Sequence, residues 1–184
     1  RSIQTILSWV TPDQLPPSIA DMQAVLARVH ASAYTGSRGW VGVADAAILL
    51  DALHDMRMVL RTISSGRDAL MLMPELAAHF DSGGGPIMVG GGSDVYSKTV
   101  VGVREGADCS SAALLILDPH YQGGATLGAD TCAASRQELW DGRWVAWRPL
   151  DTLSATSFYN FGLSQRRAQH LARANVGAQS SLRT

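Results

Sequence analysis

The side chains best placed for chemistry in this sequence are those of Asp118-Pro119-His120, which follow the apolar run Ala112–Leu117. On an extended backbone, residues i and i+2 point to the same face of a strand. The Asp118 carboxylate can then accept the imidazole N–H of His120, which fixes the tautomer of the ring and stabilises its charged form. Pro119 cannot donate a ladder hydrogen bond, so we expect the strand to loosen here and expose both groups. The pattern indicates an acid–base pair for nucleophilic catalysis; a surface turn with an uninvolved histidine is the alternative.

A second feature is a pair of glycine runs, Gly83–Gly85 and Gly90–Gly92, on either side of a short apolar segment. Glycine has no Cβ, so another backbone can approach it closely. We therefore predict that Gly90, Gly91 and Gly92 line a narrow passage for the main chain of a substrate, with plain loop flexibility as the alternative. A nucleotide site is disfavoured, because neither a GxGxxG nor a GxxxxGK[ST] pattern is present.

The two cysteines, Cys109 and Cys132, are 23 residues apart and do not form a CxxC pair. Two cysteines cannot build a disulfide framework, so we expect free thiols in a cytosolic compartment. Neither follows the glycine-flanked helix start that a nucleophile needs, so we expect both to be inert. HExxH and Cys/His ligand spacings are absent as well, which argues against a zinc site, and no metal or other cofactor is expected.

Size and composition favour one globular domain: the sequence has 184 residues, of which 46% are hydrophobic and 17% charged. Its 15 Lys and Arg nearly balance its 16 Asp and Glu. Such a balance gives no indication of nucleic acid or acidic lipid as a partner. The apolar runs are all much shorter than the about 20 residues that a membrane-spanning helix needs, so no transmembrane segment is expected.

Hydrophobic periodicity predicts helices in the first half of the sequence and a sheet in the second. The expected helices cover residues 1–10, 19–31, 43–54 and 68–80, with a strand at 56–63. Short β-rich runs between glycine-rich or polar turns predict antiparallel strands at 87–89, 96–103, 112–117, 143–147 and 157–161. This order indicates an α+β fold. Residues 166–184 are expected to form a peripheral helix or a disordered tail.

Segments spread along the sequence, in one collinear order, resemble a known family. They are Arg1-Ser-Ile-Gln-Thr-Ile6, Pro17-Ser-Ile-Ala-Asp-Met-Gln23, Gly36-Ser-Arg-Gly-Trp-Val-Gly42, His79-Phe80, Pro86-Ile-Met-Val-Gly-Gly-Gly92, Leu115-Ile-Leu-Asp-Pro-His-Tyr121, Phe158-Tyr-Asn160 and Gln165-Arg166. The family is that of the cysteine proteases specific for the ubiquitin-fold modifier. Collinearity from residue 1 to about residue 166 makes the resemblance far more specific than any single motif.

The resemblance implies a papain-like α+β protease domain over residues 1–166, with N-terminal helices packed on a mostly antiparallel sheet, followed by a C-terminal extension at 167–184. It implies that Asp118 and His120 are the catalytic acid and base. It also implies that the substrates are the ubiquitin-fold modifier and its conjugates, cleaved after the C-terminal glycine of the modifier. A cytoplasmic protein is expected, with recruitment to the endoplasmic reticulum surface by a membrane adaptor protein as a further expectation.

The family's nucleophilic cysteine would stand three positions before Arg1, so we expect the thiol, and a tyrosine near the oxyanion, upstream of this sequence. The sequence departs from the family's pattern at two places. The turn Ser93–Thr99 carries extra residues, and Ser164 stands where the family usually has proline. Two other interpretations stay open. The chain could be a non-catalytic, modifier-binding member of the same fold. It could also be an autophagy-related cysteine protease, which shares Asp-Pro-His but fits the Gly-Ser-Arg turn and the triple glycine less well.

Overall fold

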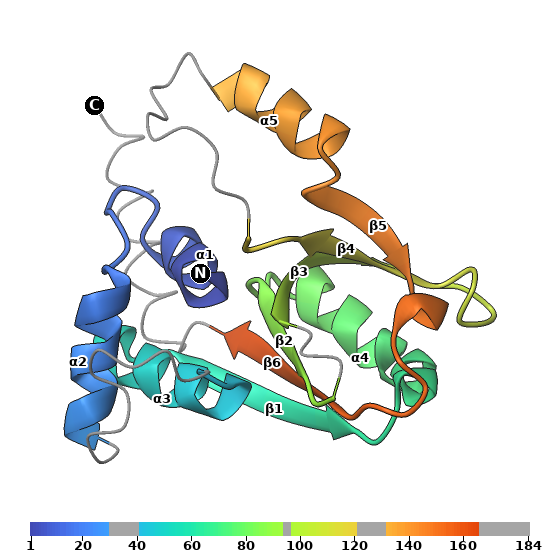
Figure 1. Cartoon of the computed structure of the whole chain (residues 1–184), viewed down its shortest axis with the longest axis horizontal. Coiled ribbons are helices and arrows are strands. Elements are labelled where there is room, and N and C mark those ends of the chain that lie inside the picture. The colour runs from blue at the N-terminus through green and yellow to red at the C-terminus, as the bar shows by residue number, and fades with distance from the viewer. Residues whose placement is uncertain (30–40, 94–96, 121–131, 166–184) are drawn as a thin grey trace, which may run out of the picture.

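The structure is a computed structural model that describes residues 1–29, 41–93, 97–120 and 132–165. Its described helices are α1 (Ser2–Val10), α2 (Ile19–Val29), α3 (Val43–His54), α4 (Ala69–Asp81) and α5 (Cys132–Asp141), with the short 3-10 turns η1 (Gly66–Asp68) and η3 (Leu150–Thr152). Its described strands are β1 (Arg57–Ile63), β2 (Ile87–Gly91), β3 (Ser97–Arg104), β4 (Ala113–Leu117), β5 (Val145–Pro149) and β6 (Tyr159–Gln165) (Figure 1).

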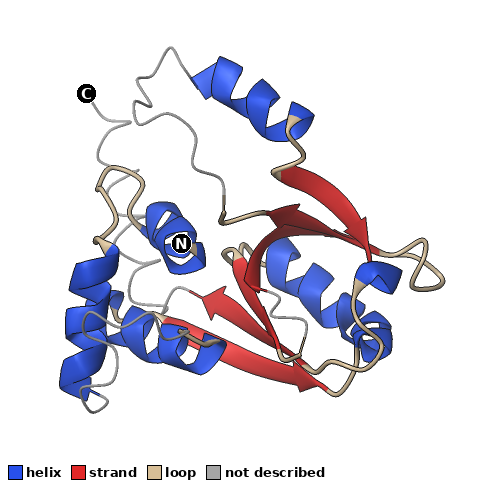
Figure 2. Cartoon of the chain, viewed as in Figure 1, coloured by secondary structure: helices blue, strands red, loops and turns tan. Residues whose placement is uncertain are grey.

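The described strands form a single six-stranded sheet in the order β1-β6-β2-β3-β4-β5. Every strand pair in it is antiparallel (Figure 2). The last described strand, β6, lies between β1 and β2, so it joins segments that are far apart in the sequence. The expected antiparallel sheet is confirmed, and β1 precedes α4 as predicted. Helix α5 lies between β4 and β5, where the sequence predicts no helix.

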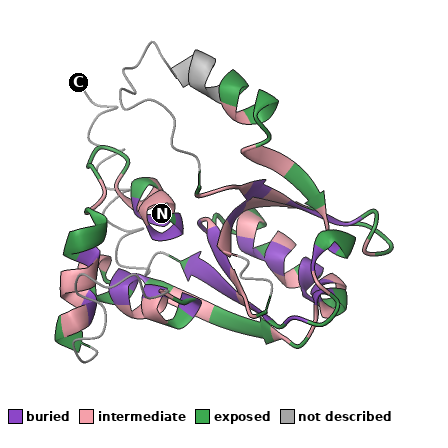
Figure 3. Cartoon of the chain, in the orientation of Figure 1, coloured by how far each residue is buried: buried purple, intermediate pink, exposed green. Residues whose placement is uncertain are grey.

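Helices cover both faces of the sheet. In β2, Ile87 and Val89 belong to the buried cluster around α4, whereas Met88 belongs to the cluster formed by α1, α2 and α3. This is the alternation that a strand with two covered faces requires. Buried residues are correspondingly concentrated on the central strands and on the helix surfaces turned toward them (Figure 3). Burying one Leu or Ile side chain completely stabilises the folded state by on the order of 1.5–3 kcal/mol relative to leaving it exposed.

Helix α1 shows how the sequence pattern produces this packing. Ile3, Ile6 and Leu7 are buried at helical spacing, in the cluster that contains Met88. Thr11 is the C-cap of the helix, and the Pro12 that follows disfavours helical backbone at the residue before it. The helix therefore lies against β2 and β3 with an apolar face and ends where the sequence predicts.

The structure contains one helix that the sequence analysis does not predict. Helix α5 covers Cys132–Asp141, and its mean hydropathy is low, so apolar periodicity gave no signal for it. Cys132 is thus the first residue of a helix, but the sequence before it is Asp130-Thr131 rather than glycine, so the expectation that it lacks a glycine-flanked helix start stands. The strand expected at 143–147 begins at Val145 instead, because Arg143 has φ 57° and belongs to the turn that follows α5.

Strand β6 also differs from its prediction, since it covers Tyr159–Gln165 rather than 157–161. Ser157 is part of a connection: its buried hydroxyl accepts hydrogen bonds from the backbone N–H groups of Gly92 and Ser93, each at 3.1 Å. The strand continues beyond Phe161 because β1 and β2 pair with it on both sides. The predictions for residues 30–31, 36–40 and 167–184 lie outside the described residues.

No helix in the part of the chain that the structure describes is long and apolar enough to cross a membrane.

Candidate active site

The backbone of Asp118 is fixed at one end of the sheet. Leu117, the last residue of β4, pairs with Thr99 of β3 and with Val145 of β5. One residue further, the Asp118 N–H donates to the carbonyl oxygen of Trp144 at 2.7 Å, so the hydrogen-bonding pattern of the sheet continues to Asp118 itself. The carboxylate therefore leaves a rigid element, which is the best support for a group that must keep its orientation.

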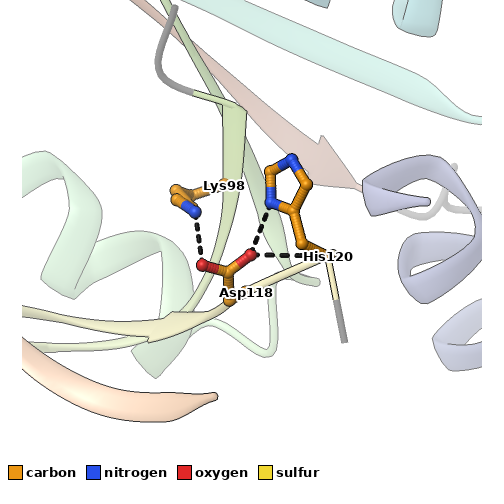
Figure 4. A network of polar contacts seen from close by, with 3 residues as sticks. All are labelled: Lys98, Asp118 and His120. Atoms are coloured by element: carbon orange, nitrogen blue, oxygen red, sulfur yellow. Dashed lines mark hydrogen bonds and ion pairs between the residues drawn. The ribbon is translucent and has the colours of Figure 1, made fainter. Parts of the chain in front are cut away.

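Asp118 holds the imidazole of His120 directly. The Nδ1 atom of His120 lies 2.7 Å from Asp118 Oδ1, and the backbone N–H of His120 donates to the same oxygen at 3.0 Å (Figure 4). The predicted contact is present, but its geometry differs from the prediction: β4 ends at Leu117, and a turn through Pro119 brings the ring back to the carboxylate. With Nδ1–H donating to the acid, Nε2 is the nitrogen that is available as a base.

The two side chains differ in exposure as an acid and a base should. The His120 side chain is 67% exposed and that of Asp118 is 24% exposed. In Figure 4 the second ring nitrogen of His120 faces away from the carboxylate. The base can therefore meet another group while the acid stays sheltered behind it.

Sequence reasoning missed a third member of this group, Lys98. Its Nζ forms an ion pair with Asp118 Oδ2, on the carboxylate oxygen that His120 does not use (Figure 4). Lys98 lies 20 residues before Asp118 in the sequence. The strand register brings the two together: Thr99 pairs with Leu117, Lys98 directly precedes Thr99, and Asp118 directly follows Leu117. Only the pairing of the two predicted strands could have given a signal for it.

These contacts set the charge state of Asp118. Burial would raise the pKa of the carboxyl, but hydrogen bonds from Lys98 and from the His120 backbone and ring lower it, and the net pKa lies below the ordinary value of 3.8. Asp118 is therefore ionised at neutral pH and can stabilise a protonated His120.

The three predicted glycines lie at the same end of the sheet as this pair. Gly90 pairs with Ser97, the residue before Lys98, and Gly91 is the last residue of β2. A close approach does occur at Gly90 and Gly92, but within the chain. A Cβ at Gly90 would lie 3.0 Å from Val43 Cγ2 of α3, and one at Gly92 would lie 2.5 Å from the Phe158 ring. Packing thus explains these two glycines without a ligand, while a role in substrate binding stays a prediction.

The described cysteine geometry is poor for catalysis at His120. Cys109 lies in the turn before β4, at the end of the strand opposite to Asp118, so the five residues of β4 alone separate the two by roughly 16 Å. Its Sγ lies 3.8 Å from the carbonyl oxygen of Arg67. By contrast, Ser2 and Ile3 in the first turn of α1 are buried, and α1 contacts β2 and β3.

No group of three or more His, Cys, Asp or Glu side chains that could hold a metal ion occurs among the described residues. An ionised acid that orients an exposed imidazole is the base-and-acid part of the arrangement with which one class of hydrolases activates a nucleophile. The described residues therefore contain an acid–base pair of the kind found in that class.

Comparison with known proteins identifies the family within that class. The model of peptidase family C78 matches residues 1–162, and the chain belongs to this family. Ufm1-specific protease 2 of Gallus gallus is 34% identical over 172 residues, which are 90% of this chain and 35% of that protein. The probable Ufm1-specific protease of Oryza sativa subsp. japonica is 33% identical over 178 residues, which are 90% of this chain and 26% of that protein.

A solved structure agrees with these relatives. The crystal structure of UfSP from C. elegans superposes with a TM-score of 0.70 at 29% identity, and the match covers 90% of this chain and 29% of that one. The papain-like α+β fold expected from the sequence is confirmed. The chain spans about a third or less of the length of these relatives.

Proposed function

We propose that this chain is the base-and-acid part of a thiol protease that cleaves after the C-terminal glycine of the ubiquitin-fold modifier Ufm1, both in its precursor and in its conjugates. The observation that carries the proposal is the 2.7 Å contact between His120 Nδ1 and the ionised Asp118. Family membership supports the peptidase class, and the names of the relatives support the modifier.

In the proposed mechanism, His120 Nε2 accepts the proton of a cysteine thiol while Asp118 stabilises the resulting imidazolium. The thiolate attacks the carbonyl carbon of the modifier's last glycine, the C–N bond breaks, and His120 gives its proton to the leaving amine. Water then attacks the thioester and loses a proton to His120, the C–S bond breaks, and the sulfur takes the proton back. The sequence of steps returns both the thiol and the neutral imidazole.

We propose that this thiol stands three positions before Arg1. The resemblance of Arg1-Ser-Ile-Gln-Thr to the segment that follows the nucleophile in the family supports this position. The start of α1 at Ser2 supports it as well, because the positive end of the helix dipole faces the residues that precede Arg1. Such a position lowers the pKa of a cysteine and increases the thiolate fraction.

A modifier probe with a C-terminal thiol-reactive group tests the placement. We expect the probe to label protein that includes the residues before Arg1, and not a chain that starts at Arg1. A change of His120 to Ala should slow the labelling of the longer protein strongly. Labelling of Cys109 or Cys132 in the shorter chain, abolished by His120→Ala, would contradict the placement of the nucleophile.

We further propose that the end of β2, from Gly90 to Gly92, lines the path of the modifier's C-terminal tail. The strand register supports this, since Gly90 pairs with Ser97 and so lies next to Lys98 and Asp118 at one end of the sheet. The main chain of a glycine-ended tail needs a surface without side chains close to the reacting carbonyl. The matched variants that test this path are given in the Discussion.

Location in the cell is a separate proposal, supported by the resemblance alone: a cytoplasmic protease that a membrane adaptor recruits to the endoplasmic reticulum. Imaging of a fluorescent fusion of the full-length protein, with and without the candidate adaptor, tests it. A fusion that stays diffuse whether or not the adaptor is present would remove the adaptor from the proposal.

A further inference from the structure

We propose that Lys98 is a positioning residue for the reaction: it holds Oδ2 of Asp118 so that Oδ1 stays aligned with the His120 ring. The inference depends on the proposed roles of Asp118 and His120 as acid and base. It adds a residue that acts through the acid, and it gives β3 a part in positioning that acid.

The geometry divides the carboxylate between two partners. Lys98 Nζ contacts Oδ2, and the His120 ring and backbone N–H both contact Oδ1 (Figure 4). A carboxylate turns easily about its terminal bond, because its χ2 torsion has broad minima. A donor fixed on each oxygen restricts that rotation. Because Lys98 extends from β3 and Asp118 from the end of β4, the sheet itself sets the distance between the two groups.

The environment makes this ion pair more effective than a surface pair. The side chains of Lys98 and Asp118 are only 20% and 24% exposed, so solvent and salt screen their attraction less than they screen a fully exposed pair. Lys98 also offsets the effect of burial, which by itself would raise the pKa of Asp118. The lysine thus keeps the acid both ionised and oriented.

The pair lines a pocket of about 240 Å³, and the pocket supplies the matched control. Two further cations, Arg143 and Arg148, line it together with Ile116 and Thr152. Among the described residues, the charged groups at Asp118 and in this pocket are Lys98 from β3, His120 from its own turn, and the two arginines from β5 and the turn before it. Arg148 is exposed and carries the same charge in the same pocket, so removing it tests the general effect of charge.

The experiment compares Lys98→Met, Lys98→Arg and Arg148→Met in the full-length protein, with a modifier–fluorophore conjugate as the substrate. We measure kcat and KM from acidic to alkaline pH and the thermal midpoint of each variant. Loss of alignment at a reacting group costs on the order of 10²-fold, so Lys98→Met should lower kcat by about that factor with little change in KM. The acidic limb of its pH profile should move to higher pH, because the pKa of Asp118 rises without the lysine.

Lys98→Arg keeps a positive donor and should recover most of kcat, and Arg148→Met should leave kcat and the acidic limb near those of the unchanged protein. If Lys98→Met does not fold, Lys98→Leu, which also removes both the donor and the charge, gives the same comparison. The inference is overturned if Lys98→Met lowers the thermal midpoint but leaves kcat and the acidic limb unchanged, or if Arg148→Met lowers kcat equally. Asp118→Asn separates the two proposals: normal turnover in that variant would overturn the function itself, whereas a severe loss there with normal Lys98→Met would overturn only the role of Lys98.

Discussion

The two ends of β4 each carry an aspartate, and the two carboxylates are held in different ways. Asp108, before the strand, accepts hydrogen bonds from the backbone and hydroxyl groups of Ser110 and Ser111, all within three residues of it. Asp118, after the strand, is bound by a lysine from another strand and by a histidine ring. The neutral donors at Asp108 come from neighbouring residues and stabilise a turn. The titratable partners of Asp118 can take part in proton transfer or set the charge of the carboxylate.

The same contrast holds for the residues next to each aspartate. Cys109 follows Asp108, and its carbonyl oxygen accepts a hydrogen bond from the Asp151 N–H at 3.0 Å, which fastens the turn to η3. At the other end, the exposed imidazole of His120 is held by the acid and by the turn at Pro119. Cys109 thus lies at one end of β4, whereas the base His120 lies at the other.

The largest expected effect breaks the active end. In the full-length protein, Asp118→Asn should lower the turnover of a modifier conjugate by up to about 10⁴-fold while the fold stays intact. His120→Ala should cost about as much, and the double variant little more, because the two residues act as a unit. Steady-state kinetics together with circular dichroism provide the measurement.

The matched control for that prediction is Asp108→Asn at the opposite end of β4. It changes the same carboxylate to the same amide, yet it should leave kcat and KM near their starting values. Equal losses of turnover for the two aspartate variants would show that the chemistry does not distinguish the two ends, and would contradict the assignment of the acid.

The second and third predictions compare two glycines, Gly91 at the active end of the sheet and Gly106 at the opposite end. Gly91→Val should obstruct the path of the modifier's tail, and an overpacked contact of about 1–3 kcal/mol would lower kcat/KM by about 5- to 160-fold. Its thermal midpoint should change by only a few degrees. Normal cleavage by a strongly destabilised Gly91→Val protein would instead assign this glycine a structural role.

The third prediction concerns Gly106 in the turn before β4. A Cβ there would lie 2.3 Å from the backbone N of Ala112, so the turn must shift to accommodate it. Gly106→Ala should therefore lower the free energy of unfolding by about 1–3 kcal/mol without a change in kcat. Urea unfolding followed by fluorescence measures the loss. A large fall in kcat at full stability would mean that the two ends of the strand are functionally coupled.

The smallest expected effect is a pH dependence at the opposite end. Hydrogen bonds from Ser110 and Ser111 lower the pKa of Asp108 from its ordinary value of 3.8 to about 2. A carboxyl with a lowered pKa stabilises the folded state above its unfolded pKa, and that contribution is lost as pH falls through the folded pKa. Thermal midpoints measured between pH 4 and pH 2 should therefore fall more steeply for the unchanged protein than for Asp108→Ala. Identical slopes would mean that the turn does not hold the carboxylate in solution.

Much of the fold could be predicted because its signals are local. Apolar spacing located α1, α3 and α4, and β-branched runs located β2, β3 and β4 to within a residue or two. Helix α5 gave no such signal because its apolar residues do not gather on one helical face. The extent of β6 was also hidden, since its second half is a strand only through pairing with β1 and β2 on its two sides.

For the site, the sequence by itself determined that an acid and a base stand two residues apart, because Asp118 and His120 are local to each other. It did not determine how they meet, since the turn at Pro119, and not strand alternation, brings the ring to the carboxylate. Only the tertiary structure decided that Lys98 occupies the other oxygen and that Val43 and Phe158 pack over Gly90 and Gly92. The physical reason is that these contacts join residues far apart in the chain, and strand register and helix packing, which no local pattern encodes, set the distances between them.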